Sequence, residues 1–96
     1  MTSVELHPAA QAELTGATDW YLARSATAAA EFVREIEHGI ERIAESPLRY
    51  PVTRYGRRRF VLLKFPYDLV YRILERRIEI IAVAHHNRRP GYWNAR

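Results

Sequence analysis

The spacing of apolar residues changes near residue 57, and that change restricts the folds open to this chain. Over about residues 8–45, apolar residues recur every three or four positions, as on one face of a helix. After residue 57 they alternate or run together in short segments bounded by turn residues, as in β-strands. Helices followed by strands indicate the α+β class. At 96 residues the chain has room for one hydrophobic core, so we expect a single domain over residues 1–96.

The pattern of the first half predicts a helical hairpin. Pro8 suits the first turn of a helix over about 8–24, because its missing N–H would have no partner there. Ser25 is a good N-cap for a second helix over about 26–45, which Pro47 ends. The apolar stripe of that helix is Phe32, Ile36, Ile40 and Ile43. The short connection predicts that the two helices run antiparallel.

The remaining pattern predicts strands. Residues 3–7 alternate between polar and apolar, and three further strands are expected over 58–65, 68–74 and 77–85. Because the last three are joined by two or three residues, they form an antiparallel meander. The order β-α-α-β-β-β therefore predicts a helical hairpin packed on one face of an antiparallel sheet, with a tail over 87–96.

A few residues of the helical half stand out. Gly16 interrupts the first helix, and a close approach by a neighbouring element would account for it. Trp20 and Tyr21 are expected to pack within the hairpin. His7 ends the first expected strand just before Pro8, and His38 lies on a polar face of the second helix, so we take both as incidental.

Composition excludes several classes of function. The chain has no cysteine, which excludes disulfides, cysteine-ligated zinc and thiol catalysis. Its four histidines are scattered, so no metal site is expected. No glycine-rich phosphate loop is present, and we expect no cofactor. No apolar run approaches the ~18–20 residues of a membrane span, so a cytoplasmic protein without a membrane partner is expected.

Charge is divided unevenly along the chain. Residues 1–47 hold eight acidic and three basic residues, a balance of −5. Residues 48–96 hold twelve basic and three acidic residues, a balance of +9. This asymmetry favours a polyanionic partner, either nucleic acid or an acidic protein segment, over the strands and the tail. A solvated basic surface that only keeps the protein in solution is the simpler alternative.

Two clusters in the basic half contain the candidate residues for binding a partner or for catalysis. Arg57, Arg58 and Arg59 open the first meander strand, whereas Arg88 and Arg89 follow the last strand, at the opposite end of the sheet. The two groups meet only if the tail folds back. Alternation directs Arg58 to one face of the sheet and its two neighbours to the other.

The second cluster runs from His85 to Trp93 and joins imidazole, guanidinium and aromatic groups. RNA cleavage needs a base, an acid and cations, and these side chains supply them. Tyr92 and Trp93 could stack on bases or on a partner's side chains. Adjacent strand residues point to opposite faces, however, so His85 and His86 serve one site only if the strand has ended. The alternative is one packed histidine and an aromatic residue that fixes the tail.

The chain resembles the RelE/ParE superfamily of bacterial type II toxins. The residues that carry the resemblance are Phe65 to Arg72, Arg77 to His85 and Arg88 to Trp93, with His7 to Ala10, Trp20-Tyr21, Phe32 and Ile43 to Pro47 upstream. The family fold, two helices against an antiparallel sheet, agrees with the periodicity. The resemblance implies a growth-inhibiting, plasmid-stabilising toxin neutralised by an antitoxin encoded beside it. A toxin homodimer and a toxin–antitoxin hetero-oligomer both stay open as assemblies.

The superfamily divides by target. RelE-like members cut mRNA on the ribosome. The resemblance places Arg59 and Arg88 at or near basic positions of the nuclease pattern, and Tyr92 could stand in for its tyrosine. Together with His86 of the second cluster, these are the candidate catalytic residues of such a nuclease. Asp68 and Val61, however, stand where the nuclease pattern has basic residues. The resemblance therefore favours the ParE-like side, which inhibits DNA gyrase without catalysis.

A third alternative is a non-toxic module that binds nucleic acid or protein. In each case the expected binding surface for target or antitoxin is Arg57, Arg58, Arg59, Arg72, Arg88, Arg89, Tyr92 and Trp93.

Overall fold

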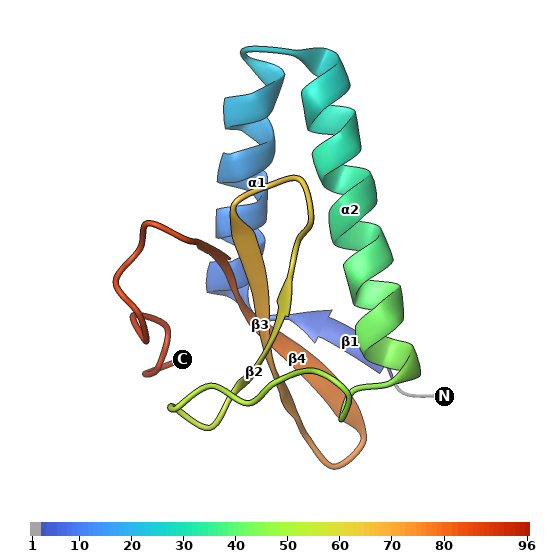
Figure 1. The fold of residues 1–96 in the computed structure, drawn as a ribbon, viewed down its shortest axis with the longest axis vertical. Helices are drawn as coiled ribbons and strands as arrows, with labels where there is room; N and C mark the ends of the chain where they lie inside the picture. Colours follow the sequence, from blue (N-terminus) through green and yellow to red (C-terminus); the bar gives the residue numbers. More distant parts are fainter. Residues whose placement is uncertain (1–2) are drawn as a thin grey trace.

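The chain forms two helices and four strands in the expected order (Figure 1). A computed structural model describes residues 3–96. The elements are β1 (Ser3–Leu6), α1 (Pro8–Leu22), α2 (Ala26–Glu45), β2 (Arg58–Val61), β3 (Tyr67–Ile73) and β4 (Arg77–His85). Both helices begin where the sequence predicts, and β4 has the predicted bounds. The α+β fold with a helical hairpin is thereby confirmed.

Side chains at the helix starts explain these bounds. The Ser25 hydroxyl accepts a hydrogen bond of 3.1 Å from the Ala28 N–H, which confirms the predicted N-cap of α2. At α1, the Nδ1 of His7 accepts from the Ala9 N–H at 3.0 Å. His7 is therefore a capping residue, and the prediction that it is incidental was wrong. The cap holds α1 where the chain leaves β1.

The sheet is mixed, which corrects the expectation of a purely antiparallel one. Its strand order is β1-β4-β3-β2, with β2–β3 and β3–β4 antiparallel as predicted. β1, however, pairs parallel with β4, placing Val4 opposite Ile78 and Leu6 opposite Ile80. This pairing joins residues more than seventy positions apart. No turn connects these strands directly, so nothing in the local pattern indicated their relative direction.

β2 is four residues long and ends before the predicted boundary at residue 65. The carboxylate of Glu35 on α2 accepts hydrogen bonds from the Leu63 and Lys64 N–H groups, at 2.5 and 3.1 Å. These two amides are therefore occupied by a helix side chain in place of a neighbouring strand. The chain turns there into β3.

The main core lies between the hairpin and one face of the sheet. Phe32, Ile36 and Ile43 of α2 pack against sheet residues including Leu69, Tyr71, Ile78 and Ile80. Gly39 permits the close approach of α2, because a Cβ there would lie 2.9 Å from Leu69 Cδ1. The expected close neighbour of Gly16 is absent, since nothing in residues 3–96 lies within 4 Å of where its Cβ would be.

The Trp20-Tyr21 pair is divided between core and surface. Tyr21 packs as expected, with its ring centroid 5.1 Å from those of Phe32 and Phe65. Trp20 is 53% exposed, with the Arg24 guanidinium 3.7 Å from its ring centroid. The prediction that both residues pack within the hairpin was therefore wrong for Trp20. Among the described helices, none is long and apolar enough to cross a membrane.

Candidate partner-binding site

The face of the sheet turned away from the helices carries a second, smaller apolar cluster. Val70 of β3 and Ile81, Ala82 and Ala84 of β4 form its floor, and Trp93 of the tail covers them. Trp93 is only 5% exposed. The tail (residues 87–96) therefore folds back across the sheet on the side remote from α2 (Figure 1). This is the arrangement under which the two arginine groups were expected to meet.

Glu13 on α1 anchors the far end of the tail. Its carboxylate accepts hydrogen bonds from the Tyr92 hydroxyl at 2.6 Å and from the Arg96 guanidinium at 2.8 and 3.1 Å. It also accepts a hydrogen bond of 3.0 Å from the Val83 N–H. Val83 lies in the part of β4 beyond the residues that pair with β1. Burial, and then the bond to Glu13, raises the pKa of Tyr92 well above its usual range. The bond to Glu13 also raises the pKa of Arg96.

Tyr55, on the loop after α2, provides a second anchor for the tail. The Tyr55 ring lies against Gly91, where an added Cβ would come within 2.6 Å of the ring. Gly91 has a φ of +78°, a conformation that suits glycine. The Tyr55 and Trp93 rings meet edge to face, with centroids 5.7 Å apart. The loop after α2 therefore holds the tail through residues that Glu13 does not bind.

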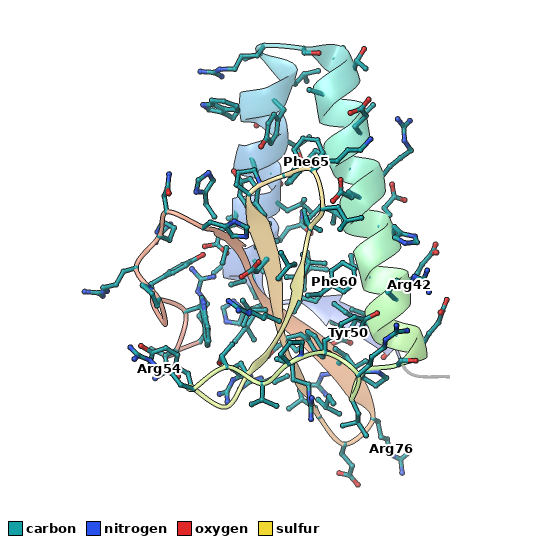
Figure 2. The ribbon with its side chains drawn as sticks, viewed as in Figure 1. Arg42, Tyr50, Arg54, Phe60, Phe65 and Arg76 are labelled. Atoms are coloured by element: carbon teal, nitrogen blue, oxygen red, sulfur yellow. The ribbon has the colours of Figure 1, made fainter. Side chains whose placement is uncertain are left out.

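A concave cavity of about 670 Å³ lies between this loop, the open face of the sheet and the tail. Its floor includes Val61, Val70 and Ala84, and its rim carries Arg54, Arg59, Arg88 and Arg89. We call it the cationic pocket. Among the described residues that line it, Asp68 is the only acidic one. Figure 2 shows Arg54 on the loop beside the tail, well away from Arg76 at the turn between β3 and β4.

Asp68 lies close to two basic side chains of the pocket. Its carboxylate lies 2.9 Å from His86 Nε2 and 3.7 Å from an Arg59 guanidinium nitrogen. The Asp68 side chain is 13% exposed, whereas Arg59 and His86 are 52% and 43% exposed. The exposed rim of the pocket is therefore cationic, and its one carboxylate lies deeper.

Several of the expected surface residues gather in this pocket. They are Arg59, Arg88, Arg89, Tyr92 and Trp93, together with the candidate catalytic residue His86. Both adjacent histidines line the pocket, because β4 ends at His85 and His86 lies beyond it. The His85 ring packs edge to face on Tyr67, while His86 meets Asp68. The arginine groups from the two ends of the sheet are thus brought together by the folded tail.

Three other expected surface residues lie outside the pocket. Arg58 is turned to the helix side, where it donates to the Leu48 and Tyr50 carbonyls at 3.1 and 2.7 Å. Arg72 forms an ion pair with Glu79 at 2.6 Å. Arg57 is partly buried, and its Nε has no hydrogen-bond partner within residues 3–96.

The candidate nuclease residues are only partly assembled. Arg59, His86 and Arg88 line the cationic pocket, but the Tyr92 hydroxyl is directed to Glu13. A phenol that donates to a carboxylate and whose pKa is raised is a poor proton donor or base at neutral pH. Across residues 3–96, no three histidine or acidic side chains lie close enough together to hold a metal ion.

Sequence reasoning missed the residues that position the tail. Glu13 gives one usable signal, because it lies three residues after Ala10 and four before Ala17, both of which are buried. A carboxylate on the buried stripe of a helix requires a polar partner. Tyr55 and Gly91 gave no such signal, since their contact depends on the folded tail.

The fold, a helical hairpin packed on a four-stranded sheet, defines the structural class of the chain. Among solved structures, the chain resembles one described as the chromosomal ParDE TA system from P. aeruginosa, with a TM-score of 0.76. The identity is 20%, over 88% of this chain and 96% of that one, so the likeness concerns the fold. It agrees with the expected RelE/ParE superfamily fold.

The family itself follows from the sequence match. The model of the ParE toxin of the type II toxin–antitoxin system parDE matches residues 4–90. Because this match covers most of the chain, the chain belongs to the ParE toxin family. The resemblance noted from the sequence is thereby confirmed. Among curated proteins, none matches the chain significantly.

Proposed function

We propose that this chain is a toxin that acts in the cytoplasm by inhibiting DNA gyrase, and that an antitoxin neutralises it. The observation that carries the proposal is the ParE toxin family match over residues 4–90. The fold likeness to a protein described as a ParDE TA system is compatible with it. The basic open face of the sheet offers a surface for such partners.

The geometry of the tail supports the non-catalytic mechanism. Tyr92, the residue that would complete the nuclease set, has its hydroxyl engaged by Glu13. Asp68 stands in the pocket where a scissile phosphate would need positive charge, and a carboxylate there repels it. Inhibition by binding requires neither a free phenol nor a phosphate site.

A ribosome-dependent mRNA endonuclease is the second candidate. The observation that favours it is the common position of Arg59, His86 and Arg88 in one pocket. Those three residues supply cations and one imidazole, which are part of what RNA cleavage needs. A module that binds a partner without toxicity is the third.

Induced expression in a bacterium that lacks the antitoxin separates these candidates. Gyrase inhibition predicts growth arrest with filamentous cells, because damaged chromosomes block division. It also predicts that primer extension on translated mRNAs finds no codon-positioned cuts. Codon-positioned cuts would replace the proposal by the nuclease, and normal growth at high expression would favour the non-toxic module.

A further inference from the structure

We infer that one face of α1 binds the same face of a second copy of this chain, with the two helices antiparallel. The face consists of Ala9, Ala12, Gly16 and Trp20, and we call it the α1 face. Trp20 of each copy packs over Gly16 of the other, so that one surface patch meets its own copy across a twofold axis. The contact uses neither the cationic pocket nor gyrase, and its test is therefore independent of the proposed function.

The α1 face is apolar although most of it is exposed. Its residues recur at intervals of three and four, as on one side of a helix. Among the exposed positions of α1, Asp19 is the only charged residue. The exposed positions of α2, in contrast, carry five charged residues, Arg34, Glu37, Glu41, Arg42 and Glu45. A surface helix usually turns polar residues away from the core, as α2 does, so the composition of the α1 face indicates a partner.

Trp20 and Gly16 form a projection and a notch on this face. The Trp20 side chain is 53% exposed, with its ring edge to face on Tyr21 at a centroid distance of 5.1 Å. Glycine lowers helix stability relative to alanine, yet nothing in residues 3–96 lies within 4 Å of where a Cβ of Gly16 would be. Packing within the described chain therefore does not require this glycine. Its missing side chain lets an incoming indole approach the helix backbone.

The notch opens into a cleft of about 530 Å³ between α1, the start of β3 and the end of β4. Gly16, Ala17 and Trp20 line one side of the cleft, and Pro66 and Tyr67 line the other. An indole at the mouth of this cleft removes apolar surface from water on both copies. The cleft therefore gives the projecting ring a surface to pack on.

The positions of the projection and the notch favour a second copy as the occupant. Gly16 and Trp20 lie four residues apart on one face, so a twofold axis between them places each Trp20 over the Gly16 of the other copy. Glu13, which anchors the basic tail, precedes Gly16 along α1. The antiparallel orientation therefore places the two tails at opposite ends of the contact, where their positive charges are kept apart.

Asp19 and Arg24 supply charge complementarity. Asp19 follows Gly16 by three residues and therefore borders the notch. The Arg24 guanidinium lies 3.7 Å from the Trp20 ring centroid and donates to the Trp20 carbonyl at 2.8 Å, so it accompanies Trp20 into the contact. Neither charged side chain has an ion-pair partner within residues 3–96. Each is therefore available to its opposite in the second copy.

The test is sedimentation velocity of the full chain. A contact made by one helix is smaller than a standard interface, so we expect a weak dimer whose average mass rises from one chain towards two between about 5 and 500 μM. Trp20→Ala removes the projection and Gly16→Leu fills the notch, and each should raise the dissociation constant at least about tenfold. Leu48→Ala is the matched control, because Leu48 is 72% exposed on the loop after α2, and it should leave the dimer unchanged.

Gly16→Leu also separates the contact from a defect in folding. Leucine favours a helix more than glycine does, and a Cβ at this position meets nothing within 4 Å. At about 2 μM, where the dimer is dissociated, the variant should unfold at a temperature no lower than that of the unaltered chain. Dimerisation and thermal stability should therefore change in different directions.

Exchange of charge tests the antiparallel pairing without altering the notch. Asp19→Arg and Arg24→Asp should each weaken the dimer at least about fivefold, because both ion pairs across the twofold axis become repulsive. An equimolar mixture of the two variants should dimerise within about threefold of the unaltered chain, since each pair again joins opposite charges. The ¹⁵N spectrum of each variant shows that it is folded.

Three results would overturn the inference. A mass of one chain at every concentration up to about 500 μM would leave the α1 face to a different protein. A dimer that Gly16→Leu does not weaken would have its contact elsewhere. A mixture of the two charge variants that dimerises no better than either alone would contradict the pairing of Asp19 with Arg24.

Discussion

The Tyr92 hydroxyl donates a hydrogen bond of 2.6 Å to Glu13, joining residues 79 positions apart. The same carboxylate also accepts hydrogen bonds from the Arg96 guanidinium and the Val83 N–H. One side chain of α1 therefore fixes the tail, and with it the wall of the cationic pocket. We therefore expect the stability of the tail to depend on this bond.

Removal of that hydroxyl is the first prediction. Tyr92→Phe should lower the free energy of unfolding by about 1.5–3 kcal/mol, because it deletes a hydrogen bond to a charged group and leaves Glu13 less well satisfied. Urea unfolding followed by tryptophan fluorescence measures the change. Tyr50→Phe is the matched control, since the Tyr50 hydroxyl has no hydrogen-bond partner within residues 3–96 and its ring packs on Phe60. Equal losses in the two variants would contradict the anchor.

Replacement of each of the two helical glycines by alanine should have opposite effects on the stability of the chain. Gly16→Ala should stabilise the chain by about 0.5–1 kcal/mol, because its Cβ meets nothing within 4 Å and alanine favours the helix. Gly39→Ala should destabilise it, since a Cβ 2.9 Å from Leu69 and 3.0 Å from Phe60 overpacks the core by about 1–3 kcal/mol. Thermal unfolding of both variants tests this contrast. A stabilised Gly39→Ala variant would show that α2 can move away from the sheet without cost.

Alkaline pH should destabilise the chain through its buried tyrosines. Burial raises the pKa of Tyr71 to about 12, and its hydroxyl donates to the Pro47 carbonyl at 2.6 Å. An unfolded tyrosine ionises near pH 10, so between about pH 10 and 12 the unfolded state has lost the proton that the folded state keeps. The stabilisation is complete below pH 10 and is lost as pH rises, with a slope of up to about 1.4 kcal/mol per pH unit for each such group.

Unfolding in urea at several values between pH 8 and 11 measures this slope. Tyr71→Phe should reduce it, and Tyr92→Phe should reduce it too, because the pKa of Tyr92 is raised in the same direction. A free energy of unfolding that stays constant from pH 9 to 11 would contradict the burial of these phenols.

The helical hairpin was predictable because its signals are local. The 3.6-residue period, Ser25 and Pro47 all act within a few residues of the positions that they specify. The parallel pairing of β1 with β4 and the early end of β2 depend on contacts between distant residues. The early end of β2 depends on Glu35, whose carboxylate accepts hydrogen bonds from two backbone N–H groups 28 and 29 residues further along the chain.

The chemistry of the candidate site was predictable, but its shape was not. Charge asymmetry indicated a basic surface, and the strand period divided the arginines of the first cluster between the two faces. The position of the tail depends on Glu13 and Tyr55, which belong to elements far from it in the sequence. Without these anchors, the sequence left open whether Arg59 and Arg88 share one pocket.

The central claim is tested most directly by a supercoiling assay with the purified full chain, purified DNA gyrase, ATP and relaxed plasmid. Because the chain carries a net charge of +4, an equal amount of lysozyme serves as a control for binding of a basic protein to the DNA. The account predicts that supercoiling falls as the chain is added and is unaffected by the control. Unchanged supercoiling at a large excess of folded chain would contradict it.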